Sequence, residues 1–140
     1  MPSQLSTGFS NHPDTLTAAL EAAKQAKSKL KYERIDAALL FTTAHYDPQE
    51  FLPGLAQSLK QTRLLGCQTS DIIVGTHVES SGIGILLITS DQIKFESGQV
   101  SHLAIQDLQA AGKTFVRDCV SGYGRFSRKL LLFFIDGLIN

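Results

Sequence analysis

Two short polar segments carry the residue types best suited to chemistry. Each follows an apolar stretch, and together they supply a thiol, an imidazole, a phenol, a carboxylate and hydroxyl groups. The residues are His45, Tyr46 and Asp47 in the first segment, and Cys67, Thr69 and Ser70 in the second. An aromatic ring, a titratable ring and a carboxylate in one loop can hold a polar ligand. Because open α/β sheets bind ligands beyond the carboxyl ends of their strands, the segments predict one shared site.

Each of these residues also has a plain structural interpretation, and the two interpretations can hold together. Asp47 can cap a helix, Tyr46 can pack on the edge of a sheet, and His45 can lie in solvent. Cys67 can be a small buried apolar residue, or a nucleophile activated by His45 if the two loops meet. No further catalytic group accompanies that pair, so we expect a protein that is not an enzyme.

Other chemistry is poorly supported by the spacing of residues. The four histidines make no short ligand spacing with another histidine or a cysteine, so no metal site is predicted. Gly82 and Gly84 lack the third glycine of a dinucleotide-binding loop and lead into a strand-like run. The sequence therefore predicts no cofactor from its own motifs.

The composition limits the partners and the compartment. Thirteen basic residues balance thirteen acidic ones, which argues against nucleic acid as a partner. The longest apolar run, residues 130–135, is too short to span a bilayer, and no signal peptide is evident at the start. With only two cysteines, the chain is expected to be cytoplasmic with reduced thiols and without a membrane partner.

Hydrophobic periodicity predicts an α/β fold in a single domain, residues 1–140. We expect a mixed, largely parallel β-sheet with three main helices and a β-hairpin, because strand and helix patterns alternate along the first half. The expected strands are residues 4–10 at an edge, 35–42, 62–67, 82–89 and 92–96, the last two forming the hairpin, and 129–135. Residues 72–75 are a short apolar run. The expected helices are a segment of about 16 residues from Asp14, one carrying Phe51 to Leu59, and residues 101–120.

Three stretches of the sequence resemble the N-terminal part of the FIST domain family. They are the strand DAALLFTT, the loop AHYDPQEFL and the segment LLGCQTSDIIVG. The resemblance implies an intracellular sensory domain that binds small ligands such as amino acids and accompanies signalling proteins, and some relatives bind haem. It carries site roles to Tyr46, Asp47, Gly66, Cys67, Asp136 and Gly137. Asp71 stands where the family usually has glycine, which adds bulk and charge beside the pocket.

Together these observations predict an intracellular sensory or signal-transduction module that binds a small molecule. A signalling protein or a second copy of the chain is the expected protein partner. One alternative is a truncated scaffold that associates through the edge after residues 129–135, since the chain is expected to be a fragment of something longer. The more distant alternatives are a haem-based gas sensor that uses His45 and an enzyme that depends on Cys67.

Overall fold

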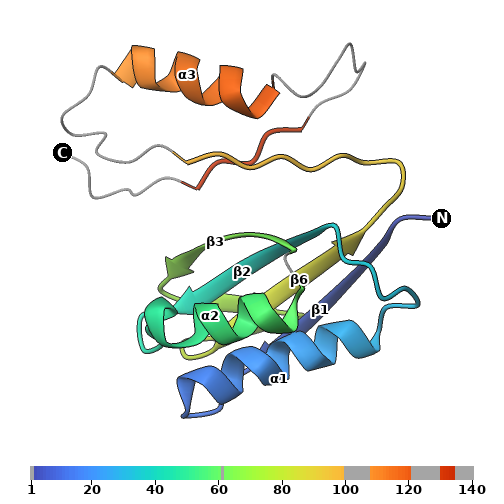
Figure 1. Cartoon of the computed structure of the whole chain (residues 1–140). Helices are drawn as coiled ribbons and strands as arrows, with labels where there is room; N and C mark the ends of the chain where they lie inside the picture. Colours follow the sequence, from blue (N-terminus) through green and yellow to red (C-terminus); the bar gives the residue numbers. More distant parts are fainter. Residues whose placement is uncertain (1, 61, 100–107, 121–129, 135–140) are drawn as a thin grey trace. The chain divides into compact units, whose positions relative to one another are not determined.

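A computed structural model covers the whole chain and describes residues 2–60, 62–99, 108–120 and 130–134. Internal contacts divide the chain into two compact units, residues 1–95 and residues 96–140. The first unit holds helices α1 and α2 and all of the described strands, and the second holds helix α3 (Figure 1).

The first unit is built on a four-stranded mixed sheet with the order β1-β6-β2-β3 (Figure 1). Its strands are β1 (Gln4–Ser10), β2 (Ala37–Thr43), β3 (Arg63–Thr69) and β6 (Ile83–Thr89). Strands β2 and β3 are parallel, and β6 runs antiparallel to both β1 and β2. Three of the four strands therefore point the same way, and the mixed α/β class and the edge position of β1 are as the sequence predicts.

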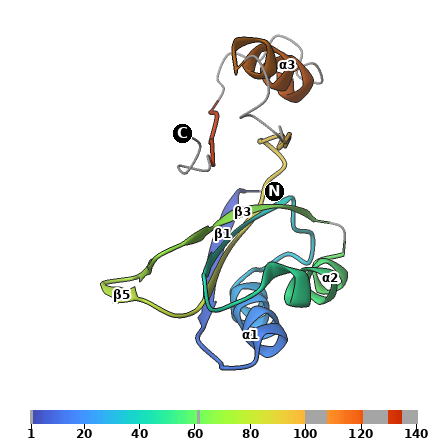
Figure 2. The same cartoon turned by 90° about the vertical axis from the view of Figure 1, so that its left-hand side faces the viewer.

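Two helices, α1 (Thr15–Ser28) and α2 (Pro48–Ser58), cover one face of this sheet (Figure 2). Both begin at an aspartate whose side chain accepts a hydrogen bond from a backbone N–H group of the first turn. Asp14 accepts from Thr17 and Asp47 accepts from Gln49, each at 2.8 Å. These caps satisfy donors that a helix start otherwise leaves without a partner, and they fix where the helices begin.

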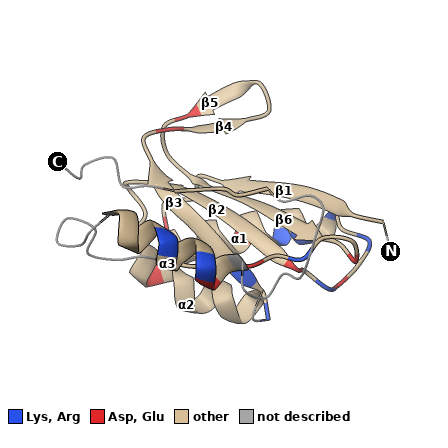
Figure 3. Ribbon diagram, turned by 90° about the horizontal axis from the view of Figure 1, so that it is seen from above, with Lys and Arg blue, Asp and Glu red and all other residues tan. Residues whose placement is uncertain are grey.

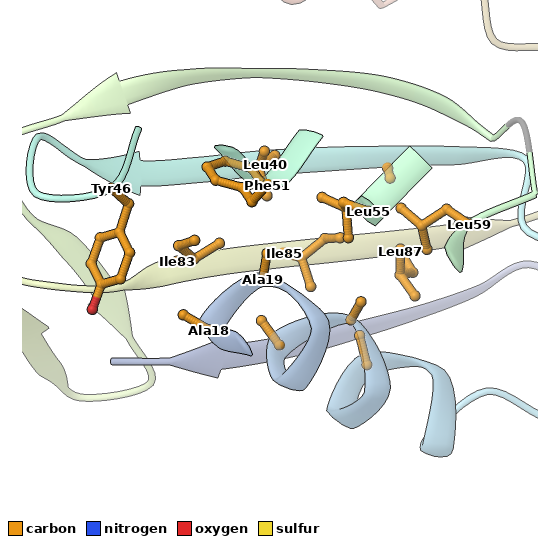
Figure 4. Packing of buried hydrophobic residues seen from close by; sticks show 14 residues of the cluster. Ala18, Ala19, Leu40, Tyr46, Phe51, Leu55, Leu59, Ile83, Ile85 and Leu87 are labelled. Carbon is orange, nitrogen blue, oxygen red and sulfur yellow. The ribbon is translucent and has the colours of Figure 1, made fainter. Parts of the chain in front are cut away.

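The core lies between the helices and the sheet, and small residues bring α1 close. Five alanines of α1 are buried, and β1 contributes Gly8 beneath them. A Cβ atom at Gly8 would lie 1.9 Å from the backbone oxygen of Ala22, so only glycine permits this approach. Larger apolar side chains fill the remaining space (Figure 4). They are Leu40, Phe51, Leu55, Leu59, Ile83, Ile85 and Leu87.

The opposite face of the sheet is also apolar. Because successive side chains of a strand point to opposite faces, the residues between the core positions share this second face. They include Leu39 and Phe41 of β2, Leu86 and Ile88 of β6, and Cys67 of β3. The central strands β2 and β6 thus have apolar residues on both faces, which explains why their sequences show no alternation.

The β-hairpin of the fold lies elsewhere than the sequence predicts. It consists of β4 (Ile72–Val74) and β5 (His77–Glu79), which project beyond the sheet (Figure 3). The turn has two residues and begins with Gly75 at a φ of 61°, as a type II′ turn requires. The expected pairing of residues 82–89 with 92–96 is wrong. The hydroxyl of Ser90 accepts from the N–H groups of Gln92 and Ile93, which turns the chain away from β6.

The second unit contains α3 (Leu108–Val120), which agrees with the described part of the expected third helix. Cys119 is buried on this helix, and Gly98 lies close to its sulfur. The expected strand at residues 129–135 is wrong for residues 130–134, which form no strand. Instead of a ladder, the segment makes an aromatic contact, with the rings of Phe115 and Phe133 5.7 Å apart. Residues 129 and 135–137 of the sequence-based expectations lie outside the described residues.

Candidate ligand site at the end of strands β2 and β3

The parallel pairing of β2 and β3 brings the two polar segments to the same end of the sheet. Thr43 and Thr69, the last residues of these strands, lie side by side in the ladder. The side-chain N–H of Gln68 donates to the backbone oxygen of Tyr46 at 3.3 Å, which ties the two segments together. We call residues 44–47 and 68–71 the rim.

Tyr46 turns from the rim into the core on the side of the helices. Only 3 % of it is exposed, and its ring packs near Ala18 and Ile83 (Figure 4). Its hydroxyl donates to the backbone oxygen of His12 at 3.0 Å, just before α1. Tyr46 therefore anchors the rim to the start of α1, and its polar atom already has a partner.

Asp47 caps helix α2 through the hydrogen bond from Gln49, with Pro48 in the first turn. Proline suits this position because the first helical N–H group has no partner within the helix. One carboxylate oxygen of Asp47 is thus engaged in fixing the direction of α2. The residue itself remains exposed at the rim.

The packing of β3 against β2 requires a glycine at position 66. A Cβ atom there would lie 1.9 Å from the backbone oxygen of Leu40, its neighbour on β2. Any side chain would push β3 away from β2 at this point. The glycine beside Cys67 therefore keeps the two strands together, and it sets the position of the rim.

Cys67 is half-buried and lies beside Phe41 on the face opposite the helices. Tyr46 belongs to the core on the helix side, so the phenol and the thiol lie on different faces of the sheet. The structure brings their backbones to one end of the sheet but does not bring these two side chains together. No hydrogen bond joins Cys67 to His45 within the described residues.

The exposed side chains of the rim include those of His45, Ser70 and Asp71. The hydroxyl of Thr69 donates to the backbone oxygen of Asp71 at 2.9 Å and folds the turn after β3. On the other side of β2, the N–H of Gly82 donates to the hydroxyl of Thr43 at 3.1 Å. These bonds give the rim a fixed backbone that presents an imidazole, a hydroxyl and a carboxylate.

The sequence interpretation did not identify Gln68, His12 and Thr43, which hold the rim in place. Gln68 could have been found from the parallel register of β2 and β3. It lies two residues after Gly66, which pairs with Leu40, and it pairs with Thr42 near the end of β2. His12 and Thr43 act through contacts with segments far away in the sequence. No local pattern marks such contacts.

The described histidines do not fit the axial ligand of a haem. His45 and His77 are exposed, whereas a haem iron ligand lies in an apolar cavity. The Nδ1 atom of His12 accepts from the N–H of Asp14 at 3.1 Å, so its Nε2 atom carries the proton. His102 lies outside the described residues. Within the described residues, no group of three histidine, cysteine or acidic side chains could hold a metal ion.

A mixed sheet covered on one face by two helices, with polar loops gathered at one end, defines an α/β module with an accessible rim. Residues 36–140 match the family model of the FIST N domain, and the chain belongs to this family. The family is one of sensory and signal-transduction domains. No curated protein matches the chain. None of the described helices has both the length and the apolar character needed to cross a bilayer.

Proposed function

We propose that this chain is an intracellular sensory module that binds a small zwitterion such as an amino acid at the rim. Its action is binding and signalling to a protein partner, not catalysis. The observation that carries the proposal is the side-by-side ending of β2 and β3, which gathers the exposed groups of both loops. In open sheets with parallel strands, ligands bind beyond these carboxyl ends.

The exposed groups suit a molecule that carries both charges. The carboxylate of Asp71 can accept from an ammonium group, and the hydroxyl of Ser70 and a ring N–H of His45 can donate to a carboxylate. Asp71 thus contributes a ligand contact at a position where the family that this chain resembles usually has glycine. Tyr46, with its buried ring, supports the loop and does not bind the ligand in this proposal.

Calorimetric titration of the full chain with a panel of amino acids tests this function. We expect one or more of them to bind, and Asp71→Asn to weaken binding by about tenfold or more, since hydrogen bonds to charged groups contribute most. His45→Ala should weaken the same ligand. Glu33→Gln is the matched control, because Glu33 is an exposed carboxylate just before the start of β2, at the opposite end of the strand.

Two results would contradict the proposal. One is that no amino acid binds to a chain whose circular dichroism spectrum shows a folded protein. The other is that Asp71→Asn and His45→Ala bind the ligand as tightly as Glu33→Gln does. Binding of haem, seen as a Soret band, would point to haem as the ligand in place of an amino acid, although the described histidines do not fit an axial ligand.

A further inference from the structure

The two edges of the four-stranded sheet differ in their protection. At the β1 edge, side chains of α1 and of Lys29, which follows it, occupy two outward backbone groups. The Nζ atom of Lys29 donates to the backbone oxygen of Thr7 at 2.7 Å, and the N–H of Phe9 donates to the Oε1 atom of Gln25 at 3.2 Å. An added strand cannot form a ladder where these groups already have partners. The β1 edge is therefore closed.

Within the described residues of the first unit, the β3 edge has no such cover. In the part of the chain that the structure describes, β3 pairs only with β2, and no side chain caps the outward backbone of residues 64–69. This stretch, LLGCQT, also lacks the charge, proline or bulge with which proteins protect an edge. An extended edge strand that carries no charge after its first residue, Arg63, favours pairing with another strand.

We propose that β3 pairs antiparallel with β3 of a second copy of this chain, with Cys67 of each copy on the two-fold axis. In this register Leu65 of one copy lies opposite Thr69 of the other, and Gly66 lies opposite Gln68. The pairing joins the two sheets into one and keeps the helices of both copies on the same face, as an isologous two-fold contact requires.

Charge selects this register and argues for a second copy as the partner. It brings Arg63 of one copy beside Asp71 of the other, and symmetry makes this pair occur twice. Both residues are exposed; Arg63 is the first residue of β3, and Asp71 lies two residues beyond Thr69, its last residue. A register centred on Gly66 would place Arg63 opposite Thr69, and one centred on Gln68 would place Leu65 opposite Asp71. Only the register centred on Cys67 matches opposite charges.

The side chains near the axis fit the same arrangement. Gly66 has no side chain, which leaves room on the helix face for Gln68 of the second copy. On the opposite face, the half-buried Leu65 and Cys67 continue the apolar surface formed by Leu39 and Phe41 across the contact. Burial of apolar side chains at the contact adds to the hydrogen bonds of the new ladder.

Sedimentation velocity measures the dimer, and a charge exchange tests its register. We expect Arg63→Glu alone and Asp71→Arg alone each to weaken the dimer by about tenfold, because opposite-charge pairs become like-charge pairs twice. The double variant should restore the dimer. Circular dichroism of each variant separates a lost contact from a lost fold. Dimerisation that is unaffected by the single changes, or not restored by the double change, overturns the register.

Oxidation with diamide tests the position of the axis. Directly opposed residues of neighbouring strands have Cβ atoms about 4.5–5.5 Å apart, which is within reach of a disulfide after a small adjustment. Diamide accepts the two electrons released as the S–S bond forms. We expect the Cys119→Ser chain to form a covalent dimer and the Cys67→Ser chain to form none. A wild-type chain that sediments as a monomer at high protein concentration, or a covalent dimer that survives Cys67→Ser, contradicts the proposal.

Discussion

Replacing Gly8 with alanine should destabilise the first unit strongly, because α1 lies directly against β1 at this residue. The added Cβ would meet the backbone oxygen of Ala22 at 1.9 Å and the backbone nitrogen of Ala26 at 2.9 Å. Ordinary contact begins at 3.4 Å, so relief of the closest contact requires the helix to retreat by about 1.5 Å. Both atoms belong to the helix backbone, which cannot give way as a side chain does.

The retreat would loosen the buried alanines of α1 along their whole length. A gap of this size removes more than about half of the dispersion attraction across the contact. Overpacking usually costs about 1–3 kcal/mol and occasionally more. We expect a loss of about 3 kcal/mol in the free energy of unfolding, which corresponds to a fall in Tm of roughly 12–24 °C for a unit of this size.

Urea unfolding followed by far-ultraviolet circular dichroism measures this loss. Gly54→Ala is the matched control, since its Cβ meets only the flexible Cδ1 atom of Leu16, at 2.7 Å. Alanine is also favoured over glycine in a helix by about 1 kcal/mol, so this variant should be close to wild type or more stable. A Gly8→Ala chain as stable as Gly54→Ala would refute the argument that Gly8 sets the distance between helix and sheet.

Two further predictions concern hydrogen bonds made by side chains. Tyr46→Phe removes the hydroxyl that donates to the backbone oxygen of His12. The free energy of unfolding, measured in urea titrations, should fall by about 1 kcal/mol, and the ligand affinity should not change. A loss of ligand affinity without a loss of stability would contradict the supporting role of Tyr46. Hydrogen bonds from the side chain and the backbone of Thr17 lower the pKa of Asp14 below its ordinary value of 3.8. The contribution of Asp14 to stability is thus present above pH 3.8 and is lost as the pH falls through the lowered pKa. In Asp14→Asn, the free energy of unfolding should therefore fall less steeply as the pH is lowered below 3.8. An equally steep fall in this variant would refute the argument.

The local elements of the fold were predictable, because their causes lie within a few residues. Asp47 followed by Pro48 marks the start of α2, and the apolar runs on either side mark β2 and β3. The position of β6 was not predictable in this way. Its sequence fits an edge hairpin and a central strand equally well, and its partners are far away in the chain.

The meeting of the two polar loops was predictable, and the directions of their side chains were not. Two polar loops after two parallel strands were expected to meet, and the register of β2 with β3 brings them together. The direction of a side chain depends on that register to within one residue, because a shift of one exchanges the two faces. For this reason the sequence could not indicate the face on which Cys67 lies. The direction of Tyr46, which lies in the loop after β2, depends on its distant contact with His12.

The interior place of β6 has a consequence for how the molecule is made. During synthesis, β1, α1 and β2 leave the ribosome well before Ile83–Thr89, yet β1 and β2 have no hydrogen bonds to each other. β6, the strand that joins them, is the last of the four to emerge, so until then the sheet of the nascent chain lacks the strand between β1 and β2. Insertion of a strand whose partners are so distant in the sequence is slow. A chain cut before Ile83 would leave the edges of β1 and β2 that normally pair with β6 exposed to aggregation.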